Sequence, residues 1–395
     1  MPEKTPWTVN EIFRRYGDKF EKKHVLSDHE RTVIAHLKRC RTEAMGGRVQ
    51  TCESCGYTRV FYNSCRDRHC PQCQSLAKER WIDAKKAETL PFPYFHVVFT
   101  LPNALIPIVL RNRRIVYDLL FEKVKETLLS AALEPKYFGA RIGFFAVLHT
   151  WGQKLNLHPH LHCVVPGGGW SEEEGRWRAS PKNYFLPVRM LAMRFRSLFL
   201  TALKAKYRSG ELDVTGSRFE RPKAFRALVD TLFKTEWVVY LKESFRDHAS
   251  VIEYLGRYTH KIAIANHRIV KVEGGEVWFS YKDYRDNNKR KVCRMPADEF
   301  MRRFCLHIVP KRFVRIRYFG LLSHRLKREA LSACREFYAL PPAESPAVRT
   351  WAEVLSDVTG IDAYRCPACG QGRLVESLFP AGNGSAKRCR MPLSF

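Results

Sequence analysis

Three histidines at every second position constrain the fold of this chain more than any other feature of its sequence. In the stretch LNLHPHLHCVV, residues 155–165, His158, His160 and His162 are each separated by one residue. In a β-strand, residues i, i+2 and i+4 lie on one face. The stretch therefore predicts a strand with three imidazoles on one face, and with Leu161 and Cys163 directed into a core on the other.

The flanking stretches predict that this strand belongs to an α+β fold. The apolar runs at 94–101 (YFHVVFTL) and 141–152 (RIGFFAVLHTWG) are typical of buried strands. Helical periodicity is found at 108–134, 188–209 and 222–235, and residues 8–43 predict two helices, the second beginning at a capping box, Ser27 to Glu30. We expect a mostly antiparallel sheet with helices packed on it and the histidine strand at its centre.

The charge of the chain favours a polyanionic partner. Its 395 residues include 68 Lys and Arg against 40 Asp and Glu, a formal net charge of +28. Nucleic acid is the commonest such partner, and aromatic residues among the basic ones, with Phe95, Trp151 and Phe319 as candidates, would supply stacking faces for unpaired bases. An anionic membrane surface is the alternative, but we find no basic amphipathic helix suited to it. Without an apolar run long enough for a membrane span or a signal peptide, the sequence predicts a cytoplasmic protein with no membrane partner.

The cysteines near the N-terminus predict a structural zinc site. Cys52-x2-Cys55 precedes Cys70-x2-Cys73 by fourteen residues, and two such pairs place four thiolates for a tetrahedral Zn²⁺. Cys65 and His69 lie between the pairs, and either is an alternative ligand. The C-terminal pair Cys366 and Cys369 is half a site to which Cys389 would add a third thiolate, and its role stays open.

The histidine strand also predicts a second kind of metal site. Two imidazoles on one strand face bind a divalent cation when a third side chain contributes, and with an oxygen ligand such a site suits Mg²⁺ or Mn²⁺ acting on a phosphate. Two chemistries use this arrangement. In histidine-triad nucleotide hydrolases a histidine is the nucleophile, whereas in HUH endonucleases a His-hydrophobe-His pair holds the metal and a tyrosine attacks.

A tyrosine nucleophile is available in the stretch SVIEYLGRYTHKIAIAN, residues 250–266. Tyr254 and Tyr258 are four residues apart, so in a short helix both hydroxyls lie on one face, and Lys261 follows. For this stretch alone, an ordinary core helix with half-buried tyrosines is the alternative. Together with the histidine strand, the cysteines and the charge, the tyrosines favour the endonuclease.

Three stretches now support a specific resemblance. YFHVVFTLP, HTWGQKLNLHPHLHCVVPGGG and YLGRYTHKIAIAN, in this order behind a cysteine-rich N-terminal segment, resemble the rolling-circle transposases of the two-tyrosine HUH class, the family named for insertion sequence 91. The resemblance implies a transposase that nicks and rejoins single-stranded DNA at element ends and target through a 5′-phosphotyrosine. It implies His160 and His162 as metal ligands and Tyr254 and Tyr258 as nucleophiles.

Other roles stay open within this resemblance. Lys261 is a candidate to stabilise the phosphate or the developing phenolate. Gln153 is the first candidate for the third metal ligand and His149 the second. His158 would contact phosphate or be structural. No nucleotide cofactor is expected, because the sequence has no G-x-x-x-x-G-K-[ST] loop.

These features predict four regions. A helical region with a four-cysteine zinc-binding module spans 1–90, the HUH catalytic domain with its tyrosine helix 91–285, a basic DNA-contact region 286–340, and a linker with the CxxC tail 341–395. A rolling-circle replication initiator or relaxase shares the same catalytic core and is the nearest alternative. The nucleotide hydrolase and a zinc-binding DNA protein without catalysis are more distant ones.

Overall fold

The computed structural model describes residues 7–90, 92–180, 185–242, 256, 262–342 and 349–381. The chain divides into two compact units, and neither is one continuous stretch. One consists of residues 1–80, 260–305 and 347–395, and we call it the cysteine unit. The other consists of residues 81–259 and 306–346, and we call it the sheet unit.

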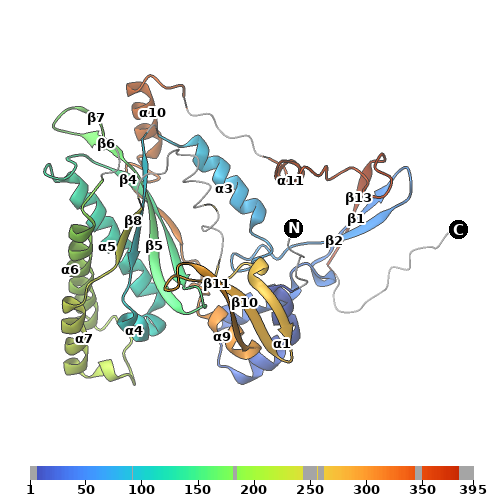
Figure 1. The fold of residues 1–395 in the computed structure, drawn as a ribbon, viewed down its shortest axis with the longest axis horizontal. Coiled ribbons are helices and arrows are strands. Elements are labelled where there is room, and N and C mark those ends of the chain that lie inside the picture. The colour runs from blue at the N-terminus through green and yellow to red at the C-terminus, as the bar shows by residue number, and fades with distance from the viewer. Residues whose placement is uncertain are drawn as a thin grey trace. The chain divides into compact units, whose positions relative to one another are not determined.

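A five-stranded antiparallel sheet is the centre of the sheet unit, with strand order β12-β4-β5-β3-β8 (Figure 1). The strands are β3 (Tyr94–Thr100), β4 (Gly143–Trp151), β5 (Leu157–Pro166), β8 (Val239–Lys242) and β12 (Ile316–Gly320). A small hairpin, β6 (Gly168–Ser171) and β7 (Arg176–Ala179), follows β5. The helices are α4 (Ile106–Arg111), α5 (Arg113–Leu133), α6 (Val188–Arg208), α7 (Pro222–Lys234) and α10 (Lys327–Phe337).

Apolar residues and histidines alternate along β5, and the helices pack on the apolar face. Leu157, Leu161 and Cys163 are buried in the main core, which also contains the apolar sides of α5, α6 and α7. Figure 1 shows these three helices along one side of the sheet. The histidines of β5 therefore lie on the opposite face, as their spacing predicts, and the α+β fold with an antiparallel sheet is confirmed.

The aromatic residues expected to stack on DNA bases lie differently. Phe95 is fully buried and stacks on Phe185, with ring centroids 5.0 Å apart. Phe319 packs on Phe144 at the edge of the same core. The prediction that these two rings stack on bases is therefore wrong, because the period of each strand turns them toward the helices. Trp151 is half-buried and stacks on His149.

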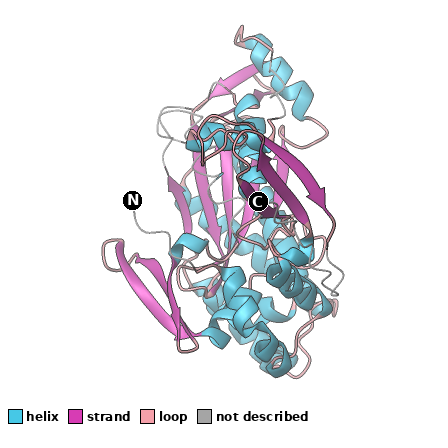
Figure 2. Ribbon diagram, turned by 90° about the vertical axis from the view of Figure 1, so that its right-hand side faces the viewer, coloured by secondary structure: helices cyan, strands magenta, loops and turns pink. Residues whose placement is uncertain are grey.

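The cysteine unit combines helices with two small antiparallel sheets (Figure 2). Its helices are α1 (Val9–Lys23), α2 (Asp28–Arg39), α9 (Ala297–Cys305) and α11 (Trp351–Thr359). One sheet has the order β13-β1-β2, formed by β1 (Gly47–Cys52), β2 (Thr58–Tyr62) and β13 (Leu374–Phe379). The other has the order β11-β10-β9, formed by β9 (Ile269–Glu273), β10 (Glu276–Asp283) and β11 (Lys289–Pro296). The helix α3 (Ser75–Ala87) spans the boundary between the units.

Local sequence explains how the first helices begin. Thr8 caps α1 by accepting the backbone N–H of Glu11 at 3.1 Å. Ser27 and Glu30 form the expected capping box at the start of α2, which satisfies two of the otherwise unpaired N–H groups.

The predicted region boundaries at 90, 285 and 340 differ from this division. Residues 260–305 join the cysteine unit, because α9 packs on α1 through Phe13 and Phe304, whose ring centroids are 5.3 Å apart. The N-terminal boundary falls inside α3, at 80. Among the described residues, no helix is both long enough and apolar enough to cross a membrane.

Candidate metal centres

Three histidines from two neighbouring strands form a cluster on the face of the five-stranded sheet opposite the main core. His149 of β4 lies opposite His160 of β5, and His162 follows two residues later on β5. Each of the three offers a ring nitrogen within 4.8 Å of the others'. The ring centroids of His149 and His162 are 4.2 Å apart, and those of His160 and His162 are 4.9 Å apart. Three imidazoles at these distances can share one cation.

Hydrogen bonds to the outer ring nitrogens orient two of these imidazoles. His160 Nδ1 lies 2.6 Å from the carbonyl oxygen of His158, so this nitrogen carries the proton and donates it, and the lone pair is on Nε2. His162 Nδ1 lies 2.7 Å from Nε2 of His96, a residue of β3, and the two rings stack at 9°. Partners of this kind fix the tautomer and orientation of histidine ligands in metal sites.

The surroundings keep these imidazoles neutral. Burial lowers the pKa of His160 to about 4, against a smaller opposing effect of the His158 carbonyl. Burial lowers the pKa of His162 well below its usual value, and the nearby His149, His160 and His96 lower it further. The pKa of His96 falls to about 4 through burial and the charge of Lys242. At neutral pH the rings are therefore in the unprotonated form that binds metals.

The third position in this cluster is taken by His149, the second candidate from the sequence. Gln153, the first candidate, lies half-buried in the turn between β4 and β5. His158 contributes its carbonyl oxygen to the orientation of His160, and its ring is not part of the cluster. His96 is missed by the sequence argument, although a histidine inside the otherwise apolar run YFHVVFTL was a visible signal.

The predicted nucleophiles lie outside the described residues. This applies to Tyr254, Tyr258 and Lys261. Gly256, between the two tyrosines, is described, buried and in helical conformation. A Cβ at Gly256 would overlap the side chain of Ile82 of α3. The absence of a side chain at Gly256 therefore allows its backbone to lie close to Ile82.

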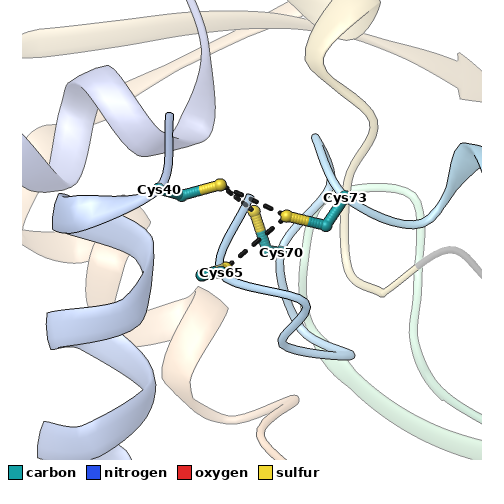
Figure 3. Close-up of side chains that lie close together, drawn as sticks. All are labelled: Cys40, Cys65, Cys70 and Cys73. Carbon is teal, nitrogen blue, oxygen red and sulfur yellow. Dashed lines mark hydrogen bonds between the residues drawn. The ribbon is translucent and has the colours of Figure 1, made fainter. Parts of the chain in front are cut away.

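The cysteine unit contains two four-cysteine clusters instead of the single predicted one. Cys70 and Cys73 lie with Cys40 and Cys65 (Figure 3). In this first cluster, Cys40 Sγ lies 3.2 Å from Cys73 Sγ and 3.6 Å from Cys70 Sγ, and Cys65 Sγ lies 3.5 Å from Cys73 Sγ. Four sulfurs about 2.3 Å from one Zn²⁺ in a tetrahedron are about 3.8 Å apart, so the cluster needs only a small expansion to hold the ion.

Polar side chains support the first cluster. Asn10, fully buried in α1, donates to Cys70 Sγ at 3.3 Å and to the carbonyl oxygen of Leu37 at 2.8 Å. His69, an alternative ligand in the sequence argument, instead pairs with Asp67 at 2.8 Å. Burial alone would raise the pKa of Asp67, but the hydrogen bonds of His69 and His36 outweigh it and lower that pKa. Cys40, which ends α2, has no CxxC partner, and no spacing rule identifies it.

Cys52 and Cys55 form the second cluster with Cys366 and Cys369. The single site predicted from Cys52, Cys55, Cys70 and Cys73 is therefore divided between two clusters. The cause is the pairing of β1 with β13, which brings the C-terminal CxxC pair to the end of the hairpin.

Two protein families and two known proteins are similar to this chain. The description "Transposase zinc-binding domain" matches residues 12–101, and "Putative transposase" matches residues 143–330. The chain is 45% identical over 387 residues to "Putative transposase y4qJ" of Sinorhizobium fredii (strain NBRC 101917 / NGR234), covering 96% of this chain and 97% of that protein. It is 31% identical over 356 residues to "Transposase for insertion sequence element IS801" of Pseudomonas savastanoi pv. phaseolicola, covering 87% and 83%.

The chain belongs to the insertion sequence 91 family of transposases. As a transposase, it is a DNA-cleaving and strand-transferring enzyme. The zinc-binding match contains all four cysteines of the first cluster, which supports zinc there. The second match contains the three histidines of β4 and β5. No solved structure matches this transposase.

Proposed function

We propose that this transposase cleaves and rejoins single-stranded DNA through a covalent 5′-phosphotyrosine, in a rolling-circle type of transposition. The observation that carries the proposal is the cluster of His149, His160 and His162, whose ring nitrogens converge on the face of the sheet opposite the main core. These residues would hold a divalent cation. When bound, the cation would neutralise charge on the non-bridging oxygens of the scissile phosphate.

The donor set favours Mn²⁺ over Mg²⁺ as this cation. Mg²⁺ prefers oxygen ligands and retains its water, whereas first-row transition ions accept imidazole nitrogen. With His149 in the third position, all three protein donors are nitrogens. Gln153 would add an oxygen donor from the adjacent turn and shift the balance toward Mg²⁺.

Tyr254 and Tyr258 supply the nucleophiles in this proposal. The phenol oxygen of one tyrosine bonds to the scissile phosphorus, and the bond from phosphorus to the 3′ oxygen breaks. The phenol proton is lost and the 3′ oxygen gains one, so the products are a 5′-phosphotyrosine and a 3′-hydroxyl. One ester replaces another, so no nucleotide is consumed. The second tyrosine allows a second transfer while the first holds a DNA end, and Lys261 would stabilise the developing phenolate.

The position of Gly256 supports the role of the tyrosines. Gly256 approaches Ile82, and Ile82 packs with Val147 and Val164 on the histidine face of the sheet. Val147 is the neighbour of His162 across β4 and β5. Gly256 therefore lies near the face that carries the histidines, and Tyr254 and Tyr258 are two residues to either side of it in the sequence.

The tyrosine proposal is tested with labelled single-stranded oligonucleotides from both ends of the element. Incubation with Mn²⁺ and a denaturing gel should show a protein–DNA adduct for the wild-type chain and for Tyr284→Phe, an exposed tyrosine of the cysteine unit. Tyr254→Phe and Tyr258→Phe should each abolish transposition while at least one still forms the adduct. An undiminished adduct in the double variant would end the assignment.

The metal proposal is tested on the same substrate. His160→Ala should lose Mn²⁺-dependent cleavage but retain DNA binding in a gel-shift assay, and His324→Ala, an exposed histidine, should retain both. Cleavage by His160→Ala at the wild-type rate would contradict the metal role. A transposition assay with an insertion element that carries a selectable marker then distinguishes a transposase from a replication initiator, since only a transposase moves the marker to a new site.

A further inference from the structure

The second cysteine cluster brings together two segments that are far apart in the sequence. Cys52 ends β1 and Cys55 lies in the turn before β2, whereas Cys366 and Cys369 lie in the turn before β13. Cys52 Sγ is 3.8 Å from Cys369 Sγ, and Cys55 Sγ is 3.7 Å from Cys366 Sγ. The paired cysteines are separated by more than 300 positions in the sequence.

The two turns of this cluster have the same backbone structure. Both read CxxCG, and the glycines, Gly56 and Gly370, have φ angles of 70° and 69°. Gly56 N–H donates to the carbonyl of Cys52 at 3.1 Å, and Gly370 N–H donates to that of Cys366 at 3.0 Å. The left-handed conformation that both turns need is one that glycine adopts without strain.

A third glycine lets the two turns meet. A Cβ at Gly372 would overlap Cys52 Sγ, so only glycine allows this approach. The N–H of Gly372 also donates to Cys369 Sγ at 3.3 Å. The turn before β13 thus places the sulfurs of Cys366 and Cys369 against those of Cys55 and Cys52, and a backbone N–H of the same turn donates to Cys369.

The core around this cluster is too small to stabilise it alone. It consists of Cys52, Cys366 and Leu374, with Tyr57 packed against them. Small modules of this kind depend on a metal or on disulfides, because hydrophobic burial does not offset the ordering of the chain. The sulfur separations are far longer than the roughly 2.05 Å of a disulfide, and they match the roughly 3.8 Å edge of a tetrahedral zinc site with four thiolate ligands.

We propose that Cys52, Cys55, Cys366 and Cys369 bind a second zinc ion that clasps the C-terminal segment to the N-terminal hairpin. Cys366 and Cys369 lie outside both matched spans, 12–101 and 143–330, so neither description accounts for this site. Two further interactions connect the same segments: the pairing of β1 with β13, and a hydrogen bond from Arg59 to the carbonyl of Ala363 at 3.0 Å. The proposal does not depend on the tyrosine chemistry.

Zinc content tests this proposal directly. Elemental analysis of the purified full chain should give two zinc ions per chain for the wild type and for Cys293→Ser, a half-buried cysteine outside both clusters. The double variant Cys366→Ser, Cys369→Ser should hold one. One ion per wild-type chain, or an unchanged content in the double variant, would overturn the second site.

Thiol alkylation in the wild-type chain tests it without any variant. Cys55 and Cys369 are exposed, so without a metal both should react at once with iodoacetamide in the presence of a reductant. We expect both to be protected until a chelator is added, with Cys293 reacting equally before and after, as read by peptide mass spectrometry. Rapid alkylation of Cys55 and Cys369 before chelation would refute the proposal.

Discussion

The buried His307 provides a quantitative test of how the sheet holds the candidate metal site. Its Nδ1 lies 3.2 Å from Thr150 Oγ1, and its Nε2 lies 3.2 Å from the carbonyl oxygen of Leu155. In the neutral ring, Nε2–H donates to the carbonyl and Nδ1 accepts the hydroxyl proton. His307 thus connects the end of β4, beside His149, with the turn that leads into β5.

The pKa of His307 sets how much the free energy of unfolding depends on pH. Burial, opposed in part by the Leu155 carbonyl, lowers this pKa from 6.5 to about 3. Between these values the unfolded chain binds a proton that the folded chain does not, so the free energy of unfolding falls as the pH falls from 6.5. With these values the loss between pH 7 and pH 5 is about 2 kcal/mol from this residue.

The variant His307→Gln removes this titration and keeps an amide near the same atoms. At pH 7 it should cost about 1–2 kcal/mol, since one hydrogen bond and some packing are lost. At pH 5 its deficit relative to the wild type should shrink by about 2 kcal/mol and so vanish or reverse. The other histidines are present in both proteins, so their contributions cancel in the difference.

Amide hydrogen exchange reports the free energy of opening for β4 and the turn at 152–156 at each pH. His324→Gln, the same substitution at an exposed position, is the matched control. If the deficit of His307→Gln is the same at pH 5 as at pH 7, the argument from burial is refuted.

Three further predictions concern the metal centres. His96→Ala should weaken Mn²⁺ binding about 10- to 100-fold in calorimetry, because it removes the hydrogen-bond partner of His162. His158→Ala keeps the backbone carbonyl that orients His160, so it should change Mn²⁺ affinity little. Equal effects of the two variants would contradict the orientation argument. Gly372→Ala should release the second zinc, because its Cβ would overlap Cys52 Sγ. Gln371→Ala, at the exposed neighbouring position, should retain that zinc in elemental analysis. Asn10→Ala should lower the stability of the N-terminal helices by about 2–3 kcal/mol in thermal denaturation, because it leaves the Leu37 carbonyl and Cys70 Sγ without their hydrogen-bond donor. An unchanged melting midpoint would contradict this and show that water replaces the Asn10 amide.

The histidine strand was predictable because its information is local. A period of two places His160 and His162 on one face and Leu161 on the other, and the structure has that arrangement in β5. The contribution of His149 depends on which strand lies beside β5 and in which register, and a single sequence does not specify that register.

The cysteines show where local spacing fails. Two CxxC pairs fourteen residues apart predict one site, but in the structure the two pairs lie in different four-cysteine clusters. The partners of Cys52 and Cys55 come from the far end of the chain through β13, and Cys40 comes from the end of a helix. Long-range strand pairing, rather than the chemistry of the ligands, decides the grouping.

The division into units follows from the same cause. The strands of the segment 262–305 form a small sheet of their own, yet its helix α9 packs Phe304 on Phe13 and pairs Asp298 with Lys23 of α1. Neither contact has a signature in the local sequence, so the sequence alone does not group this segment with α1.

The register of β5 links the stability of the fold to the geometry of the candidate metal site. A shift of one residue relative to β3 and β4 would turn Leu157, Leu161 and Cys163 outward and bury the imidazoles in the main core. Burying three polar rings there without their partners would cost several kcal/mol, which disfavours the shift strongly. The apolar positions of the strand therefore hold His160 opposite His149 and His162 within hydrogen-bond distance of His96. The precision of the site is thus a property of the core behind it, and the sequence LHPHLHCV encodes both at once.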